Sequence, residues 1–147
     1  MAMWQSTDTQ DLIALLRERG QRVTSQRVVI LRELRRTGGH ATAEQIHRAV
    51  HRSLPGTSTP TVYATLELLV ELGLARKLEL GLGAALFDAR TDAHEHAVCR
   101  SCGRIEDLDL ELDAPALLRQ AGADGFVPRC TELVISGLCA ECARATG

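Results

Sequence analysis

The sequence predicts an α+β fold, an N-terminal winged-helix domain followed by a small α/β domain. Three observations lead to this prediction. Apolar residues recur at helical spacing through most of residues 11–73, a glycine-centred pair of short strands follows, and two C-x-x-C pairs lie in the last third of the chain. With 147 residues and 45% apolar content, the chain is one ordinary domain or two small ones and not a disordered protein.

Three amphipathic helices are predicted in the first 55 residues. The first ends at Gly20, and the second starts at an N-cap, Thr24 or Ser25. The third starts at Thr42, where Gln45 three residues later completes a capping box. Their predicted buried faces contain Leu12, Leu15, Leu16, Val28, Leu31, Leu34, Ile46, Ala49 and Val50.

A fourth helix is predicted from Thr59, its N-cap, to Gly73, its C-cap. Pro60 takes the first helical position, where its missing N–H costs nothing. The buried face lies late in the helix, so the first turns carry small polar groups and Tyr63. Such a start suits a helix that enters the major groove of DNA tip first. A hairpin around Gly81-Leu82-Gly83 would supply the wing.

The charge distribution supports a nucleic-acid-binding first half. Residues 1–87 carry 11 Lys and Arg against 8 Asp and Glu, whereas residues 88–147 carry 6 against 11. A basic half joined to an acidic half favours a nucleic-acid module tied to a cation-binding module. The alternative is a plain helical domain whose Tyr63 packs in its own core. The predicted DNA-binding residues are Arg17, Arg22, Arg27, Ser58, Thr59, Thr61 and Tyr63.

The two C-x-x-C pairs predict a structural zinc site. Cys99 and Cys102 form the first pair, and Cys139 and Cys142 form the second. Four thiolates in two such pairs complete tetrahedral zinc without an open position, and the metal would supply folding energy to a small segment. A redox pair is the alternative. The remaining Cys130 is expected to be a small buried hydrophobe.

The segment between the cysteine pairs predicts a small dimerisation module. We expect a strand over residues 104–112, a helix over 114–121 and a strand over 126–138. Apolar residues alternate along both strands, which predicts a sheet with one buried face that a second copy completes. A homodimer of winged helices would read a pseudo-palindromic site in double-stranded DNA. The alternating residues are Ile105, Leu108, Leu110, Leu112, Leu133 and Ile135.

A second group of metal-binding side chains lies near residue 90. His94 and His96 alternate on an extended segment and therefore point the same way. Imidazoles with carboxylates suit Fe(II) or Mn(II), and zinc is also possible. A metal that joins them to His40 would lock the two halves at one angle, which is a switch. The alternative is surface histidines on a hinge. The candidates are His40, Asp88, His94, Glu95, His96, Glu106 and Asp107.

These features divide the chain into three parts and exclude several classes. We predict a winged-helix DNA-binding domain over 1–87, a hinge with regulatory ligands over 88–97 and a dimerisation domain over 98–147.

No apolar run approaches the ~20 residues that cross a bilayer, and the start lacks a signal-peptide pattern. We therefore expect a cytoplasmic protein without a membrane partner. No open catalytic position or attacking thiolate is evident, so we expect no enzyme. A zinc-ribbon adaptor would leave the basic half unexplained.

The chain resembles the ferric uptake regulator family of bacterial metal-dependent repressors. The motifs are RVTSQR, HATAEQIH, TPTVY, AHEHAVCRSCGRI and GLCAEC, in the family's order and spacing, from about Leu12 to Cys142. The resemblance implies a winged-helix DNA-binding domain, a dimerisation domain and a structural zinc on the four paired cysteines. It also implies that Tyr63 and the start of its helix face the operator.

The resemblance further implies a regulatory metal site, with the ligands His40, Asp88, His94, His96 and Asp107. Since both acidic ligands are Asp, the chain looks most like the peroxide-sensing branch. In that branch bound Fe(II) reacts with peroxide and ligand histidines are oxidised, here at the positions of His40 and His94, while Mn(II) leaves the repressor active. The alternative is a repressor of metal uptake genes that responds to iron or manganese. A zinc-responsive repressor is the less favoured form of this alternative.

Three departures from the family pattern stand out. A further metal site of many iron and zinc sensors would fall on Ala93 and Thr131, so we expect that site to be absent. Ala64 stands where many members have Arg after the tyrosine of the DNA-reading helix. Glu106 lies beside Asp107, and only one of two neighbouring strand residues can face the metal.

Overall fold

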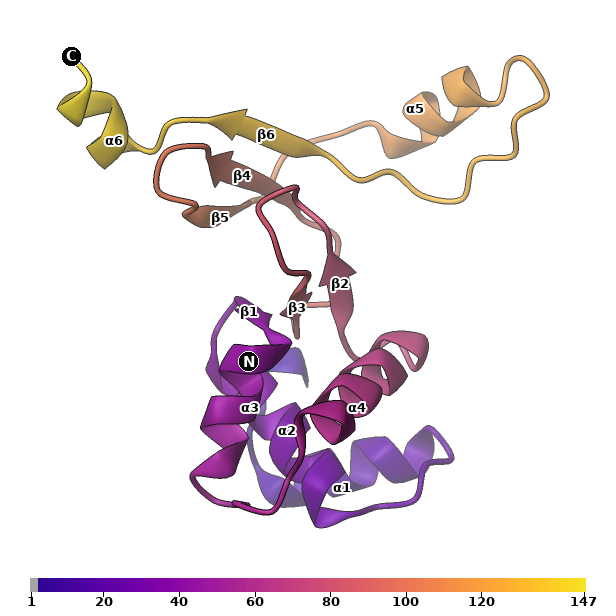
Figure 1. Ribbon diagram of the computed structural model, residues 1–147. Helices are drawn as coiled ribbons and strands as arrows, with labels where there is room; N and C mark the ends of the chain where they lie inside the picture. Colours follow the sequence, from indigo (N-terminus) through magenta and orange to yellow (C-terminus); the bar gives the residue numbers. More distant parts are fainter. Residues whose placement is uncertain (1–2) are drawn as a thin grey trace. The chain divides into compact units, whose positions relative to one another are not determined.

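The computed structural model describes residues 3–147, so the first two residues of the predicted 1–87 domain lie outside the described part (Figure 1). The chain divides into two compact units, Met1–Asp92 and Ala93–Gly147. Among the described residues, no helix has the length and apolar character needed to cross a membrane.

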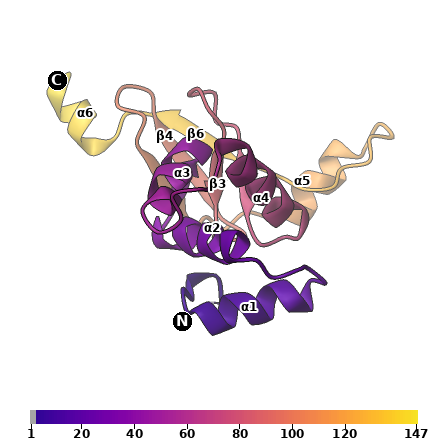
Figure 2. The ribbon, with the colours of Figure 1, turned by 60° about the horizontal axis from the view of Figure 1, so that its bottom comes forward.

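The first unit contains the four predicted α-helices, in which α2 contacts α1, α3 and α4. Figure 2 shows α1 running alongside α2. Asp8 caps α1 and Thr24 caps α2, while Thr42 and Gln45 form the predicted capping box on α3. The helices are η1 (Met3–Gln5), α1 (Thr9–Glu18), α2 (Ser25–Arg36), α3 (Ala43–His51) and α4 (Thr59–Glu71).

The caps of α4 differ from the prediction by one residue at each end. The N-cap is Ser58, whose backbone is extended and whose Oγ accepts from the backbone N–H of Thr61 at 3.3 Å. Thr59 is therefore the first helical residue and Pro60 the second, a place that also needs no intrahelical N–H. The C-cap is Leu72, and Gly73 follows it at a φ of 70°, where glycine is favoured.

A three-stranded antiparallel sheet completes the first unit. The predicted hairpin forms β2 (Arg76–Leu78) and β3 (Leu86–Asp88), which confirms the wing. A strand that the sequence did not predict, β1 (His40–Thr42), pairs with the other side of β3, giving the order β1-β3-β2. Three residues that end at the helix cap Thr42 are too few to produce an alternating pattern. The register sets His40 opposite Asp88.

The first unit has a continuous hydrophobic core. Leu, Val, Ile and Ala dominate it, with Phe87 as the one large aromatic among its buried members in the described part of the chain. The predicted inward-facing residues of α1, α2 and α3 are buried, except that Ala49 is half-buried. Late in α4, Leu66 and Leu69 are buried, and Val70 and Leu72 are half-buried. The core contains Leu12, Leu15, Leu16, Val28, Val29, Ile30, Leu31, Leu34, Ile46, Val50, Val62, Leu66, Leu69 and Phe87.

The second unit is built on a mixed three-stranded sheet in the order β5-β4-β6. β5 runs antiparallel to β4, whereas β6 runs parallel to it. The predicted helix is confirmed, but the predicted strands over 104–112 and 126–138 are too long. Each neighbour pairs only with β4, which is five residues long and limits both. The elements are β4 (Glu95–Cys99), β5 (Ile105–Leu108), α5 (Ala114–Ala121), β6 (Val134–Gly137) and α6 (Ala140–Ala145).

The predicted buried face of this sheet does not form within one chain. Across residues 93–147, all of which are described, Val98 and Cys99 are the buried hydrophobic residues. Leu110, Leu133 and Ile135 expose 42%, 37% and 46% of their surface. The second unit therefore lacks a core of its own and carries apolar surface that a partner would cover.

Candidate metal centres

The sheet of the second unit brings the two cysteine pairs together. Cys99 is the last residue of β4, and Cys139 lies after β6 at the N-cap position of α6, where its side chain makes no capping hydrogen bond. Because β4 and β6 are parallel and pair Cys99 with Gly137, both C-x-x-C turns begin at the same end of the sheet. One ligand atom from each of the four cysteines lies within 4.8 Å of the others.

The spacing of these thiols fits tetrahedral zinc. The Sγ atoms of Cys102 and Cys139 are 3.8 Å apart. Four sulfurs at the usual Zn–S distance form a tetrahedron with edges of about 3.8 Å. The first turn is closed by Gly103, which has a φ of 75° and donates its N–H to the carbonyl of Cys99 at 3.0 Å. The cysteine cluster therefore fits a structural zinc ion with no open position.

Electrostatics also favours a cation among these thiols. Backbone N–H groups of Cys102 and Cys139 donate to Cys99 and lower its pKa to about 6. A hydrogen bond with Ser101 lowers the pKa of Cys142, but contacts with the thiols of Cys139 and Cys102 outweigh it and raise that pKa to about 12. Neighbouring thiols thus resist becoming thiolates together, and a divalent cation removes this repulsion.

Two other features of the second unit were not anticipated. Arg104 and Glu141 form an ion pair with an N–O distance of 3.3 Å that ties the two cysteine turns together. Because these residues are 37 positions apart, no local sequence pattern predicts that they pair. The prediction that Cys130 is buried is wrong. This cysteine is exposed, because it lies in the long connection between α5 and β6, where nothing packs over it.

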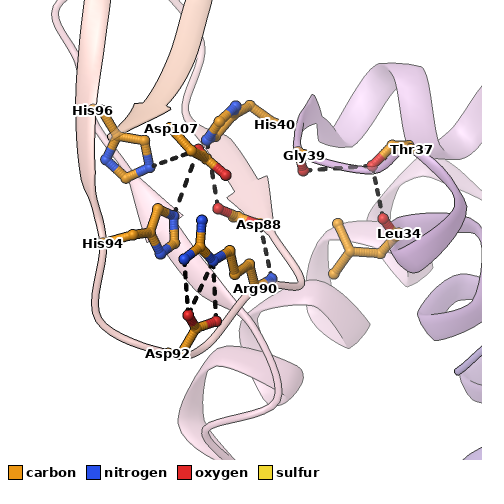
Figure 3. A network of polar contacts seen from close by, with 10 residues as sticks. All are labelled: Leu34, Thr37, Gly39, His40, Asp88, Arg90, Asp92, His94, His96 and Asp107. Atoms are coloured by element: carbon orange, nitrogen blue, oxygen red, sulfur yellow. Dashed lines mark hydrogen bonds and ion pairs between the residues drawn. The ribbon is translucent and has the colours of Figure 1, made fainter. Parts of the chain in front are cut away.

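The first unit holds one pair of the predicted regulatory ligands. The antiparallel register of β1 and β3 sets His40 opposite Asp88, and the Nε2–Oδ2 distance is 3.4 Å (Figure 3). Asp88 is only 1% exposed, and its Oδ1 accepts from the backbone N–H of Arg90 at 2.8 Å. The Arg90 side chain is in turn ion-paired with Asp92 at 2.9 Å. This pair offers one imidazole and one oriented carboxylate.

The second unit holds a separate set of three. His94 directly precedes β4 and His96 lies within it, so both side chains are on one side, with ring centroids 4.7 Å apart. Asp107 on β5 is paired with His96 in the register. Its Oδ1 lies 3.6 Å from Nε2 of His94 and 3.7 Å from Nε2 of His96 (Figure 3). Two imidazoles and a carboxylate therefore converge.

Neither nearby glutamate joins this set. Glu106 pairs with Ala97 on the opposite face of the sheet and lines a hollow of about 150 Å³ there. Glu95 accepts a hydrogen bond from the backbone N–H of Leu133 at 2.9 Å, which ties β4 to the segment before β6. Of the two neighbours on β5, Asp107 is the one whose side chain lies next to the histidines.

The predicted DNA-binding residues lie at the start of α4 and on α1, α2 and the loop between those two helices. Tyr63 is 46% exposed, so the alternative that it packs in the core is wrong. Ser58 and Thr61 are joined by a hydrogen bond of 2.9 Å between their hydroxyls, and Thr59 lies between them on the surface. Arg17 and Arg22 are exposed, whereas the guanidinium of Arg27 donates to the carbonyl of Arg22 at 2.9 Å and so also shapes this loop.

Comparisons with known proteins agree on one family. The sequence profile of the ferric uptake regulator family matches residues 18–129. The peroxide operon regulator of Bacillus subtilis is 36% identical over 138 residues, which cover 93% of this chain and 94% of that protein. The peroxide-responsive repressor PerR of Staphylococcus epidermidis is 34% identical over 136 residues, covering 92% and 90%. A zinc uptake regulator solved in complex with zinc and DNA has a TM-score of 0.72 at 26% identity, covering 96% and 99%.

Proposed function

The chain belongs to the ferric uptake regulator family, and from this premise we propose that it is a metal-dependent, DNA-binding transcriptional repressor that senses peroxide. The observation that carries the proposal is the convergence of His94, His96 and Asp107 in one unit, with the His40–Asp88 pair in the other. The similarity to repressors named for their response to peroxide supports the choice of signal.

The regulatory metal would take ligands from both units. The first unit offers His40 and Asp88, and the second offers His94, His96 and Asp107. Three imidazoles and two carboxylates make a five-ligand N/O set that suits Fe(II) or Mn(II). Neither unit offers a complete sphere. An ion held by both would stabilise one arrangement of the units, and the loss of any ligand would release it.

Peroxide would act on the ligands themselves. Bound Fe(II) would supply the one-electron chemistry that splits the O–O bond of hydrogen peroxide and would recover its electron from the imidazole, so that the ring is the net reductant and the iron is not consumed. In the net reaction one oxygen atom replaces a hydrogen on a ligand imidazole as a hydroxyl group, and one water molecule leaves. The modified ring is a poorer ligand, so the two units are no longer held together. His40 and His94 are the proposed targets, one from each unit.

The cysteine site and the apolar sheet have a separate role. Zinc on Cys99, Cys102, Cys139 and Cys142 would hold the second unit folded, and a second copy of the chain would cover its apolar surface. The homodimer would set two DNA-reading helices on a pseudo-palindromic operator. Such a repressor works in the cytoplasm, where thiols stay reduced.

Tyr63 at the exposed start of α4 provides a test of the DNA-reading role. Tyr63→Ala removes an aromatic contact from the helix tip without touching the core. We expect operator binding to weaken by about 1–3 kcal/mol, the usual range for one base contact. Fluorescence anisotropy with operator and with unrelated DNA measures this, while sedimentation confirms the dimer. Equal loss on both DNAs would assign Tyr63 to the phosphate backbone instead.

The choice of signal is tested by peroxide. The zinc-loaded protein is loaded with Fe(II) or with Mn(II), and operator binding is measured before and after a brief exposure to hydrogen peroxide. We expect the Fe(II) form to lose binding, with one added oxygen atom on the peptides that contain His40 or His94, and the Mn(II) form to keep it. An Fe(II) form that resists peroxide, with unmodified histidines, would instead identify a repressor that responds to iron or manganese.

A further inference from the structure

Two histidines of α3 belong to neither candidate centre. His47 and His51 are one helical turn apart and therefore share a face of the helix. Their ring centroids are 5.9 Å apart. His47 is half-buried and His51 is exposed, so both can be reached from solvent. Imidazoles at this spacing are able to chelate one ion.

A backbone carbonyl fixes the state of the His47 ring. Its Nε2 lies 2.9 Å from the carbonyl oxygen of Thr57. A carbonyl oxygen only accepts, so Nε2 must carry the hydrogen, and Nδ1 of the neutral ring keeps its lone pair. Histidines that bind metals usually donate their other N–H to a carbonyl or carboxylate in this way, which orients the ring. Nδ1 is therefore the nitrogen of His47 that is left to bind an ion.

We propose that His47 and His51 form a third metal site, on α3, for a borderline divalent ion such as Ni(II), Cu(II) or Zn(II). With two imidazoles as its ligands, the site selects the ions that prefer nitrogen over the harder Mn(II), which prefers carboxylates and water. Water would complete the coordination sphere. The site lies wholly within the first unit, so it does not depend on how the two units are arranged.

The site is coupled to the start of α4. Thr57 is 3% exposed and directly precedes Ser58, the N-cap of that helix. A cation on Nδ1 of His47 draws electron density from the ring and makes its Nε2–H a stronger donor to Thr57. The metal would thus hold the turn that positions Ser58, Thr59 and Thr61. That this turn positions a DNA-reading helix rests on the proposed function; the metal binding does not.

The test uses the full-length, zinc-loaded protein and Ni(II) as the probe. Titration calorimetry should count about two Ni(II) per chain in the wild type, one at the regulatory ligands and one at the α3 pair. His51→Ala, at an exposed position, should remove one of the two. The paramagnetic ion should broaden the amide signals of His47, His51 and Thr57 in the wild type and not in His51→Ala. His94→Ala is the matched control, because it should lose the other ion and keep this broadening.

Amide exchange measures the coupling without DNA. Ni(II) should slow exchange of the backbone N–H groups within residues 57–61, where Pro60 has none, by about tenfold, equivalent to one strengthened hydrogen bond. His47→Gln keeps a donor for Thr57 but lacks the imidazole ligand, so it should fold normally and show no slowing. Unchanged Ni(II) stoichiometry and broadening in His51→Ala would overturn the site. Normal binding with no change in exchange at 57–61 would overturn the coupling.

Discussion

The two units of the chain bury different kinds of side chain. The first unit packs Leu16, Leu66 and Phe87 into a continuous core, each less than 2% exposed. The second unit buries His94, His96 and Cys99 with Val98, while Leu110 and Ile135 remain on its surface. One unit is thus organised by apolar packing and the other by side chains that bind metals.

This difference determines whether each unit needs a metal ion or a second chain for its stability. An apolar core stabilises the first unit by itself. A segment of about 50 residues has little core, so zinc and a second chain have to supply what packing does not. The basic, self-contained unit reads DNA, and the unit that depends on metal and partner joins two copies.

Loss of the zinc site should have the largest effect. Cys99→Ser should release about one zinc ion per chain and unfold the second unit, while the first unit keeps its helices. Elemental analysis and residue-resolved amide exchange check both parts. Cys130→Ser is the matched control. Because Cys130 lies outside the cluster, this variant should retain the zinc ion. If amide exchange in Cys99→Ser were equally slow in both units, the second unit would not need zinc to fold.

Truncation of one apolar side chain in each unit sharpens the contrast. Leu66→Ala leaves a cavity in a closed core and should destabilise the first unit by about 2–5 kcal/mol. Ile135→Ala removes a side chain that is 46% exposed, so it should change the melting of the monomer little. It should instead shift the monomer–dimer equilibrium toward monomer in sedimentation. If both variants lowered the melting temperature alike at low concentration, the second unit would have a core of its own.

The neighbouring acids of β5 provide a finer comparison. Asp107 lies 3.6 Å from His94, whereas Glu106 lies on the opposite face of the sheet. Asp107→Asn should weaken Mn(II) binding by at least about tenfold, and Glu106→Gln should leave it unchanged. Mn(II) titrations followed by electron paramagnetic resonance distinguish the two variants. The reverse order would make Glu106 the ligand and would weaken the peroxide assignment.

The smallest effect concerns the cap of α4. Ser58→Ala removes the hydroxyl that accepts from Thr61 and should cost about 1 kcal/mol, mostly as fraying of the first turn. Thr59→Ala, at the first helical position, should cost less than Ser58→Ala. Thermal melting compares the stability of the two variants. A larger loss of stability for Thr59→Ala would mean that Thr59 is the N-cap, as predicted from the sequence.

The sequence predicted best where a residue's own neighbours determine the structure. The capping box at Thr42, the wing and the individual C-x-x-C turns are local signals, and all three correspond to the fold. It predicted less well where tertiary pairing decides. The strand at His40 forms because β3 offers it an edge, and the strands beside β4 stop where β4 stops. The side of β5 that Asp107 takes follows from its register with His96, which no periodicity in residues 104–112 reveals.

Metal counting on ligand variants tests the central claim most directly, namely that one regulatory ion is held by both units. Zinc-loaded wild type, His40→Ala and His94→Ala are titrated with Mn(II) under identical conditions. We predict one Mn(II) per chain in the wild type and loss of that ion in both variants, with the zinc retained throughout. Undiminished Mn(II) binding in His40→Ala would mean that the second unit holds the ion alone, and would contradict the claim.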